Sequence, residues 1–168
     1  MDDLDLDSSA WRFALLAYGR PGVAEECLGL QDRFGVDVSL LLVCLWLGRE
    51  GGVALSGAEF DSLEAVAAAW RDLAVTPLRG VRRGLKASAL MRHEPVASFR
   101  QRLQKTEIEA ERIEIALLHA EALRLVARPG EGRAEAALAN LRLVLARSGA
   151  PPDLALPRLS ATLTDPAS

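Results

Sequence analysis

Apolar residues recur along most of this chain at intervals of three and four positions, the spacing of an amphipathic helix. No stretch alternates between apolar and polar residues for long enough to predict a strand. Glycine, proline and capping residues divide the pattern into six or seven helices, expected at about residues 9–18, 21–34, 38–49, 57–75, 76–91, 95–127 and 133–147. The sequence therefore predicts an all-α, single-domain helical bundle.

The segment that follows Asp37 is apolar on nearly every side. From residue 38 to about residue 49 it consists mainly of Leu, Val, Cys and Trp. Asp37 has a side chain suited to a helix N-cap, and a helix without a polar face belongs at the centre of a bundle. We therefore expect this helix in the middle of a domain that covers residues 1–148. Residues 149–168, which begin Gly-Ala-Pro-Pro, are expected to form a flexible tail.

The sixth predicted helix is long for so small a domain. Its 32 or so residues, at a rise of ~1.5 Å each, give a length of nearly 50 Å. The helix is therefore expected either to kink near Lys105 and Thr106 or to project from the domain. It carries two apolar stripes, which leaves two interpretations open. Either one stripe contacts a second chain, as in a homodimer, or both belong to one broad buried face.

The composition narrows the class of protein. The chain has 168 residues and is 50% hydrophobic, which suits one compact domain with its own core. Its longest apolar run, from Leu40 to Leu47, is much shorter than the ~20 residues that a membrane-spanning helix needs. The acidic N-terminus does not resemble an export signal, and Cys27 and Cys44 have the spacing of neither a zinc site nor a redox motif. We expect a cytoplasmic protein without a cofactor.

Charge is distributed unevenly along the chain. The net charge is −3, yet residues 1–70 hold four basic and twelve acidic groups, whereas residues 71–105 hold nine basic and two acidic groups. Four cations in the basic stretch recur at helical spacing: Arg79, Arg82, Arg83 and Lys86. They share one face of the predicted helix, where like charges repel one another. A segment this basic needs an anionic counterpart.

The sequence is compatible with three anionic counterparts for this basic segment. The next predicted helix carries Glu107, Glu111 and Glu114 on one face, so the two helices are expected to dock through ion pairs. Alternatively, the arginines stay partly free and bind a phosphate, a nucleotide or a nucleic-acid backbone, for which the planar guanidinium group is well suited. A third interpretation places the basic helix on a membrane surface.

The sequence contains no recognisable catalytic or metal site. No Glu-x-x-His pair accompanies the glutamate row, as a carboxylate-bridged metal site in a bundle would require. There is no nucleophile elbow, phosphate-binding loop or dinucleotide fingerprint. His93 is expected in a solvated loop and His119 on a helix surface. We therefore assign no catalytic residue and no metal ligand.

Four segments together carry a family resemblance: Leu30–Gly48, Tyr18–Ala24, Pro77–Lys86 and Glu107–Arg112. Over about residues 11–120 the chain resembles an uncharacterised proteobacterial family of small helical proteins, catalogued as a domain of unknown function. The resemblance implies an all-helical, soluble bacterial protein, and it transfers no catalytic residue.

The first of these segments contains a cluster of polar residues beside the apolar helix: Gln31, Asp32, Arg33 and Asp37. Helix capping and a local ion pair are the structural explanation of this cluster. The functional alternative is the mouth of a pocket, which would have mixed charge if an arginine of the basic helix reached the turn.

These observations favour an accessory or adaptor protein that binds a protein partner through the basic helix or the long sixth helix, without catalysis. The alternative is an enzyme or carrier for a small anionic, phosphorylated ligand held by the arginines, and nucleic-acid binding ranks third. An enzyme or carrier is expected to have a concave pocket with converging polar groups and perturbed pKa values. An adaptor is expected to expose an apolar or basic patch and to lack such a pocket.

Overall fold

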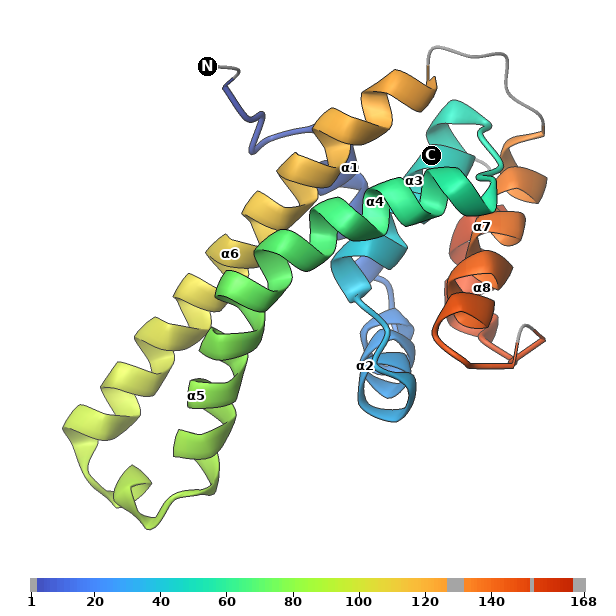
Figure 1. Cartoon of the computed structure of the whole chain (residues 1–168). Helices are drawn as coiled ribbons and strands as arrows, with labels where there is room; N and C mark the ends of the chain where they lie inside the picture. Colours follow the sequence, from blue (N-terminus) through green and yellow to red (C-terminus); the bar gives the residue numbers. More distant parts are fainter. Residues whose placement is uncertain (1–2, 127–131, 152, 165–168) are drawn as a thin grey trace.

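The chain folds into an assembly of helices. The structure is a computed structural model, and it describes residues 3–126, 132–151 and 153–164. In these residues there is no strand, which confirms the all-α prediction (Figure 1). The helices are α1 (Ser9–Tyr18), α2 (Val23–Phe34), α3 (Val38–Gly51), α4 (Gly57–Trp70), α5 (Thr76–Ala87), α6 (Glu94–Val126), α7 (Arg133–Arg147) and α8 (Pro157–Thr164).

The segment between α4 and α5 differs from the prediction of two separate helices. A π-helical segment, Arg71–Val75, joins α4 to α5 without a break, so the two form one bent helix. A short 3-10 turn, Ala89–Arg92, then leads into α6. With α4 and α5 counted as one, the described residues form seven continuous helices, in agreement with the expected six or seven.

Capping side chains set the starts of three helices. The Ser8 hydroxyl accepts a hydrogen bond from the backbone N–H of the third residue of α1. At the start of α3, Asp37 Oδ1 accepts from the Leu40 N–H at 3.1 Å. Ser56 and Glu59 form a reciprocal capping box at the start of α4. Each cap satisfies backbone donors that the helix itself leaves free.

Helix α3 lies at the centre of the fold, as its apolar sequence predicts. Its residues from Ser39 to Gly48 are all buried, and it contacts α7, α6 and α1 most closely. A Cβ atom at Gly48 would lie 2.4 Å from backbone atoms of Ala137, so α3 and α7 can approach this closely only because residue 48 has no side chain.

A buried amide joins the same two helices. Asn140 of α7 has no exposed area. Its Nδ2 donates to the carbonyl oxygens of Cys44 and Val53 at 2.8 and 2.9 Å, and its Oδ1 accepts from the Leu55 N–H at 2.8 Å. Asn140 thus satisfies Val53 and Leu55 in the segment after α3, and its own polar atoms all have partners, which is the condition for burying a polar group here.

The structure differs from the predicted tail in one segment. Residues 157–164 form α8, in which Leu159 and Leu163 are fully buried. A carboxylate from α2 caps this helix, because Glu26 accepts the backbone N–H groups of residues 158 and 159 at 3.0 and 2.8 Å. The parts of the predicted tail at residues 152 and 165–168 lie outside the described residues, as does the predicted end of the sixth helix at about residue 127.

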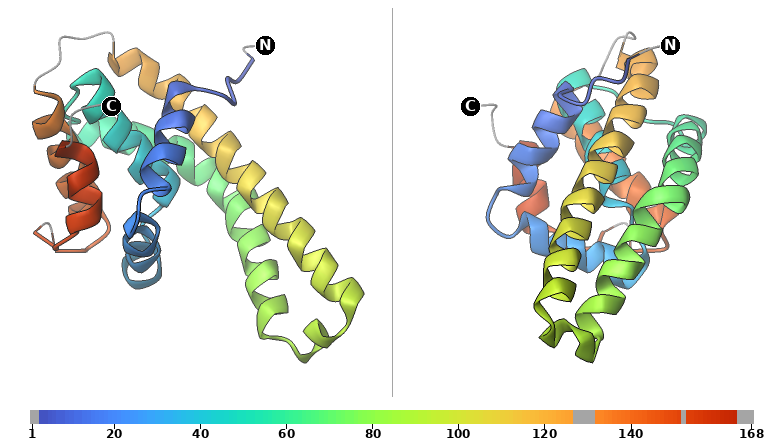
Figure 2. Two further views of the ribbon diagram at one scale, coloured as in Figure 1. Left: turned by 180° about the vertical axis from the view of Figure 1, so that it is seen from behind. Right: turned by 90° about the vertical axis from the view of Figure 1, so that its left-hand side faces the viewer.

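Helix α6 is continuous and projects from the body of the protein. Its N-terminal half runs antiparallel to α5, and the two form a hairpin that extends from the other helices (Figure 2). No residue from 76 to 106 is buried, and we call this stretch the arm. None of the described helices has both the length and the apolar composition needed to cross a membrane.

Candidate functional site

A cavity of about 640 Å³ lies where the arm meets the body. Its walls come from α1, the second half of α2, the turn before α3, the start of α3, the π-helical segment, α5 and α6. We call it the central cavity. The charged and amide side chains in its lining are Gln31, Asp37, Arg71, Arg79, Arg82, Arg83, Gln104, Glu107, Glu111 and Glu114. The structure therefore brings together residues that the sequence singled out on the polar turn, the basic helix and the glutamate row.

Two arginines of α5 form ion pairs with two glutamates of α6, and we call these four residues the clasp. Arg79 Nε donates to Glu107 Oε1 at 3.0 Å, and Arg79 Nη2 donates to Glu111 Oε1 at 2.7 Å. Arg82 Nη2 also donates to Glu107 Oε1, at 3.1 Å, and its Nε donates to Oε2 of the same carboxylate. The Glu107 side chain is only 6% exposed, and such a buried charge needs these partners.

The clasp perturbs its two carboxylates in opposite directions. Burial alone would raise the pKa of Glu107, but the hydrogen bonds from Arg82 and Arg79 outweigh it, and the pKa is lowered. The pKa of Glu111 is raised, because burial outweighs the single hydrogen bond from Arg79. Glu107 is therefore the carboxylate that the two arginines hold in its charged form.

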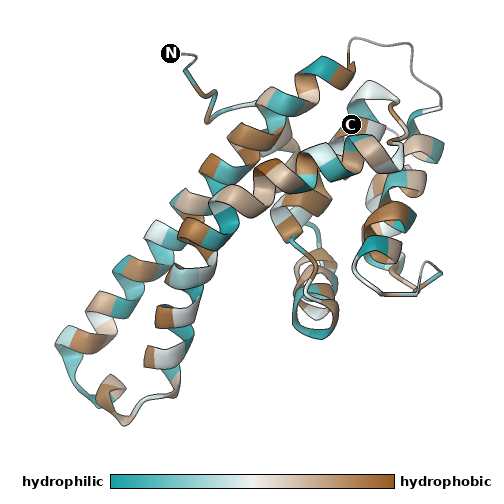
Figure 3. Cartoon of the chain, in the orientation of Figure 1, coloured by the Kyte–Doolittle hydropathy of each residue, from teal (hydrophilic) through white to brown (hydrophobic). Residues whose placement is uncertain are grey.

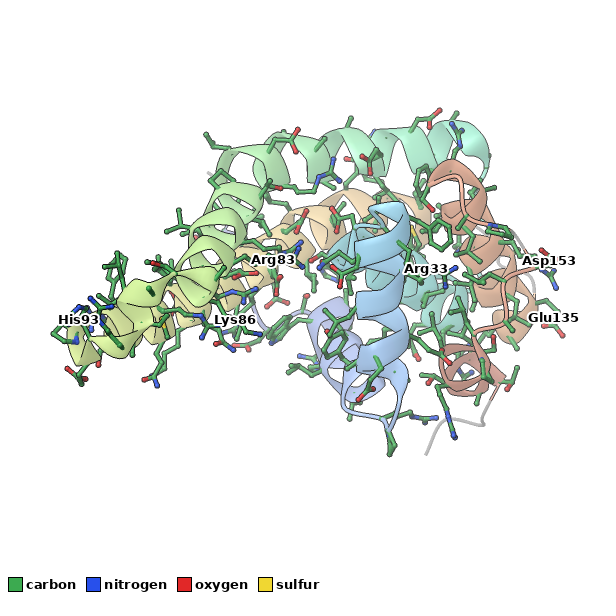
Figure 4. The ribbon with its side chains drawn as sticks, turned by 90° about the horizontal axis from the view of Figure 1, so that it is seen from below. Arg33, Arg83, Lys86, His93, Glu135 and Asp153 are labelled. Carbon is green, nitrogen blue, oxygen red and sulfur yellow. The ribbon has the colours of Figure 1, made fainter. Side chains whose placement is uncertain are left out.

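The other predicted cations take different positions. Arg83 pairs with Asp32 of α2 at 3.0 Å, and both side chains are more than half exposed, so this pair is weak. Figure 4 places Arg83 on the side of α5 that faces α2. Lys86 lies further along the arm and has no ion pair within the described residues. The Arg33 guanidinium lies over the Phe34 ring, outside the lining of the cavity.

At its inner end the cavity reaches an ion pair between Asp37 and Arg71. Besides capping α3, Asp37 accepts from Arg71 Nη1 at 2.9 Å, and Arg71 also donates to Glu64 at 3.0 Å. Arg71 is the first residue of the π-helical segment. Arg71 is not recognisable as a site residue in the sequence, because nothing in the spacing around it shows that the helix widens there.

Glu114 corrects the prediction that three glutamates meet the basic helix, because it takes no part in the clasp. It lies one helical turn further into the body, where it is 1% exposed, beside Asp37 and Ser39. Burial, together with the neighbouring charge of Asp37, raises the pKa of Glu114 to about 9. Its Oε1 atom is buried and makes no hydrogen bond within the described residues. A neutral carboxyl group with one unused oxygen therefore lines the central cavity.

The outer wall of the cavity is apolar. Leu15, Leu28 and Ile108 line it and remain about half exposed, at 54%, 45% and 49%. Trp11 and Tyr18 contribute aromatic surface to the same wall. An apolar mouth with a few polar groups at depth is the usual arrangement of a small-molecule site.

The remaining candidates for chemistry lie elsewhere. His93 is exposed at the tip of the arm (Figure 4). His119 corrects the prediction of a surface histidine: it is 8% exposed, its ring lies 5.0 Å from that of Trp46, and burial lowers its pKa. Within the described residues no group of three His, Cys, Asp or Glu side chains is placed to hold a metal ion.

Residues 9–118 match the family described as "Protein of unknown function (DUF2390)". This confirms the resemblance to an uncharacterised domain family over nearly the same residues. The match extends from the first residue of α1 into α6, so it includes every residue that lines the central cavity. No curated protein and no solved structure matches the chain.

Proposed function

We propose that this chain, which belongs to the DUF2390 family of proteins of unknown function, binds a small and largely apolar molecule in the central cavity. The molecule carries a neutral polar group that hydrogen-bonds with Glu114. The proposal is one of binding, and it assigns no catalytic residue. It places the protein in the cytoplasm, which the two buried free cysteines support.

The unpartnered oxygen of Glu114 is the observation that carries this proposal. A buried polar atom without a hydrogen bond costs ~1–3 kcal/mol, so native proteins leave few of them. Glu114 is 1% exposed, and Oε1 is the atom without a partner. Since Glu114 also lines the cavity, a bound molecule is able to supply the missing hydrogen bond.

The walls of the cavity indicate the rest of the ligand. Leu15, Leu28 and Ile108 would each lose exposed apolar surface when an apolar body fills the mouth. Burial of such surface contributes roughly 25 cal/mol per Å². Small-molecule affinity in a site like this one comes mainly from apolar contact, whereas the few polar groups fix the orientation.

The ion pairs favour a neutral ligand over the phosphorylated one that the sequence suggested. Every arginine in the lining already has a carboxylate partner: Arg71 has Asp37, Arg79 and Arg82 have Glu107, and Arg83 has Asp32. An incoming phosphate would have to compete with these carboxylates for the arginines, and the charges of Asp37 and Glu107 would repel it. The neutral carboxyl group of Glu114 also favours a neutral ligand, because a hydroxyl or amide group is able to donate a hydrogen bond to Oε1 and a fully ionised phosphate is not.

The adaptor hypothesis receives less support from the same criteria. A concave cavity with converging polar groups and a perturbed carboxyl is the arrangement expected of a carrier or an enzyme. A protein partner, a homodimer and nucleic-acid binding therefore stay predictions, and the cavity provides no argument for any of them.

Displacement of a fluorescent dye tests the proposal. N-phenylnaphthylamine, a neutral apolar dye, is titrated into the purified protein and then displaced with octanamide or with octanoate. The two competitors share an apolar body and differ in the charge of the head group. We expect octanamide to displace the dye at a concentration about tenfold lower than octanoate needs, because its neutral amide N–H is able to donate to Glu114 Oε1, whereas the carboxylate of octanoate has no hydrogen to donate.

Two matched variants locate the binding. Ile108→Glu places a charge in the mouth of the cavity, and Leu16→Glu places the same charge on α1 outside the lining, where Leu16 is 75% exposed. We expect only Ile108→Glu to weaken dye binding. The proposal fails if the dye does not bind, if octanoate competes as well as octanamide, or if both variants weaken binding equally.

A further inference from the structure

The outer part of the arm carries an excess of positive charge that the chain itself does not neutralise. Residues 76–106 contain eight Lys or Arg residues and one acidic residue, Glu94. Three of the arginines form the ion pairs at the base of the arm described above. Four exposed cations further out have no ion pair within the described residues: Lys86, Arg92, Arg102 and Lys105.

The same part of the arm exposes large apolar side chains. Leu90, in the 3-10 turn at the tip, is 53% exposed, and Phe99 on α6 is 45% exposed with the Arg102 guanidinium over its ring. In Figure 3 hydrophobic segments continue to the end of the hairpin. Apolar residues at the end of a projecting element, flanked by cations, are suited to the boundary between lipid head groups and acyl chains.

The rest of the chain has the opposite charge. The whole chain carries a formal charge of −3 although the arm is strongly basic, so the residues outside the arm are strongly acidic in sum. The arm extends away from these helices (Figure 2). A negatively charged surface would therefore attract the tip of the arm and repel the body. The protein would approach such a surface with the tip of the arm first.

We propose that the tip of the arm docks on an anionic lipid surface. Leu90 and Phe99 enter the boundary of the bilayer, while Lys86, Arg92 and Arg102 contact the anionic head groups. The docking is peripheral and reversible. It is independent of the ligand proposed for the central cavity, because it uses none of the residues in the lining.

Two other occupants fit the arm less well. A nucleic-acid backbone would use the cations and would leave the apolar side chains at the tip in water. The arm of a second copy carries the same excess of positive charge, so two arms would repel each other. Of these three, a lipid surface is the one that uses both kinds of exposed side chain.

Sedimentation with vesicles tests the proposal on the full chain. One set of vesicles contains phosphatidylcholine alone, and in the other set one third of it is replaced by phosphatidylglycerol. We expect binding to the anionic vesicles only, and weaker binding as salt is added. Replacing Arg92 and Arg102 together with Gln is expected to lower the affinity about 25-fold, since each cation near such a surface contributes a factor of about five. Leu90→Ser is expected to lower it about fivefold.

Controls separate the arm from the remaining surface. Arg124→Gln removes an exposed cation at the other end of α6, and Leu16→Ser removes an exposed leucine from α1. Both variants are expected to bind vesicles like the unmodified protein, and circular dichroism checks that all variants are folded. The proposal is overturned if anionic vesicles do not bind the protein, or if the controls weaken binding as much as the arm variants. It is also overturned if Leu90→Ser has no effect while a single-stranded RNA homopolymer displaces the vesicles, because the arm would then bind nucleic acid through charge alone.

Discussion

The protonation of Glu114 makes a quantitative prediction about stability. The carboxyl group lies 1% exposed beside Asp37, and burial raises its pKa from 4.5 to about 9. Between these two values the folded protein holds a proton that the unfolded chain releases. This contribution to stability is therefore complete below about pH 4.5 and is lost as the pH rises towards 9.

Replacing Glu114 with Gln isolates this contribution. Glutamine has nearly the same shape, stays neutral at every pH and retains one carbonyl oxygen. A group whose pKa is this high in the folded state lowers the free energy of unfolding by ~1.4 kcal/mol per pH unit within the window. Across three pH units the loss is about 4 kcal/mol, a large fraction of the 5–15 kcal/mol that stabilises a typical domain.

Urea denaturation at a series of pH values measures the difference. We expect the unmodified protein and Glu114→Gln to have similar free energies of unfolding near pH 5, and we expect the variant to be the more stable by several kcal/mol near pH 8. Glu109→Gln, which removes an exposed carboxylate from the same helix, controls for the loss of a charge on α6. Two parallel curves for Glu114→Gln and the unmodified protein across this range would refute the assignment of a neutral, buried carboxyl group.

Three further predictions concern the framework of the cavity. Asn140→Ala removes the side-chain partner of the Val53 carbonyl and the Leu55 N–H, which lie outside the helices, and should lower the free energy of unfolding by about 3 kcal/mol, whereas a loss below 1 kcal/mol in urea denaturation would mean that water replaces the amide. Gly48→Ala should cost ~1–3 kcal/mol because α3 and α7 must separate, while Gly29→Ala, with open space around it, should be neutral or stabilising. Arg82→Glu should lower the melting temperature clearly, since it places a second negative charge beside the buried carboxylate of Glu107. Arg83→Glu should change the melting temperature little, because the pair with Asp32 is exposed. Equal effects of the two variants would contradict the assignment of a buried ion pair to Arg82 and not to Arg83.

The sequence predicts the local features of this fold well. The N-cap at Asp37 needs only its side chain and the next few residues, and the structure contains it. The central place of residues 38–49 follows from a helix with no polar face. These features depend on short-range chemistry, which is why a single sequence is sufficient to predict them.

The features that the sequence does not predict depend on which elements meet. Helix α8 is capped by Glu26, more than 130 residues earlier in the chain, and no local pattern reports such a partner. Glu107, Glu111 and Glu114 share a helical face, yet only the first two meet the arginines of α5. Helix α5 runs antiparallel to α6, so residues later in α6 lie opposite residues earlier in the bent helix formed by α4 and α5. Glu114 therefore lies opposite the π-helical segment and not opposite α5. The spacing of residues along the sequence shows which face of a helix they share, whereas the register between two packed helices decides which residues pair.

The same register explains why one basic helix supports two different roles. The sequence presented its cations as a single row that either pairs within the chain or stays free. The structure divides the row by its distance from the body: Arg79 and Arg82 lie level with Glu107 and are neutralised, whereas Lys86 lies further out and has no ion pair within the described residues. The paired arginines close one wall of a cavity that also contains the neutral carboxyl group of Glu114. The unpaired cations gather where no helix of the body reaches, so any anion that binds this chain by charge should bind at the tip of the arm and not in the cavity.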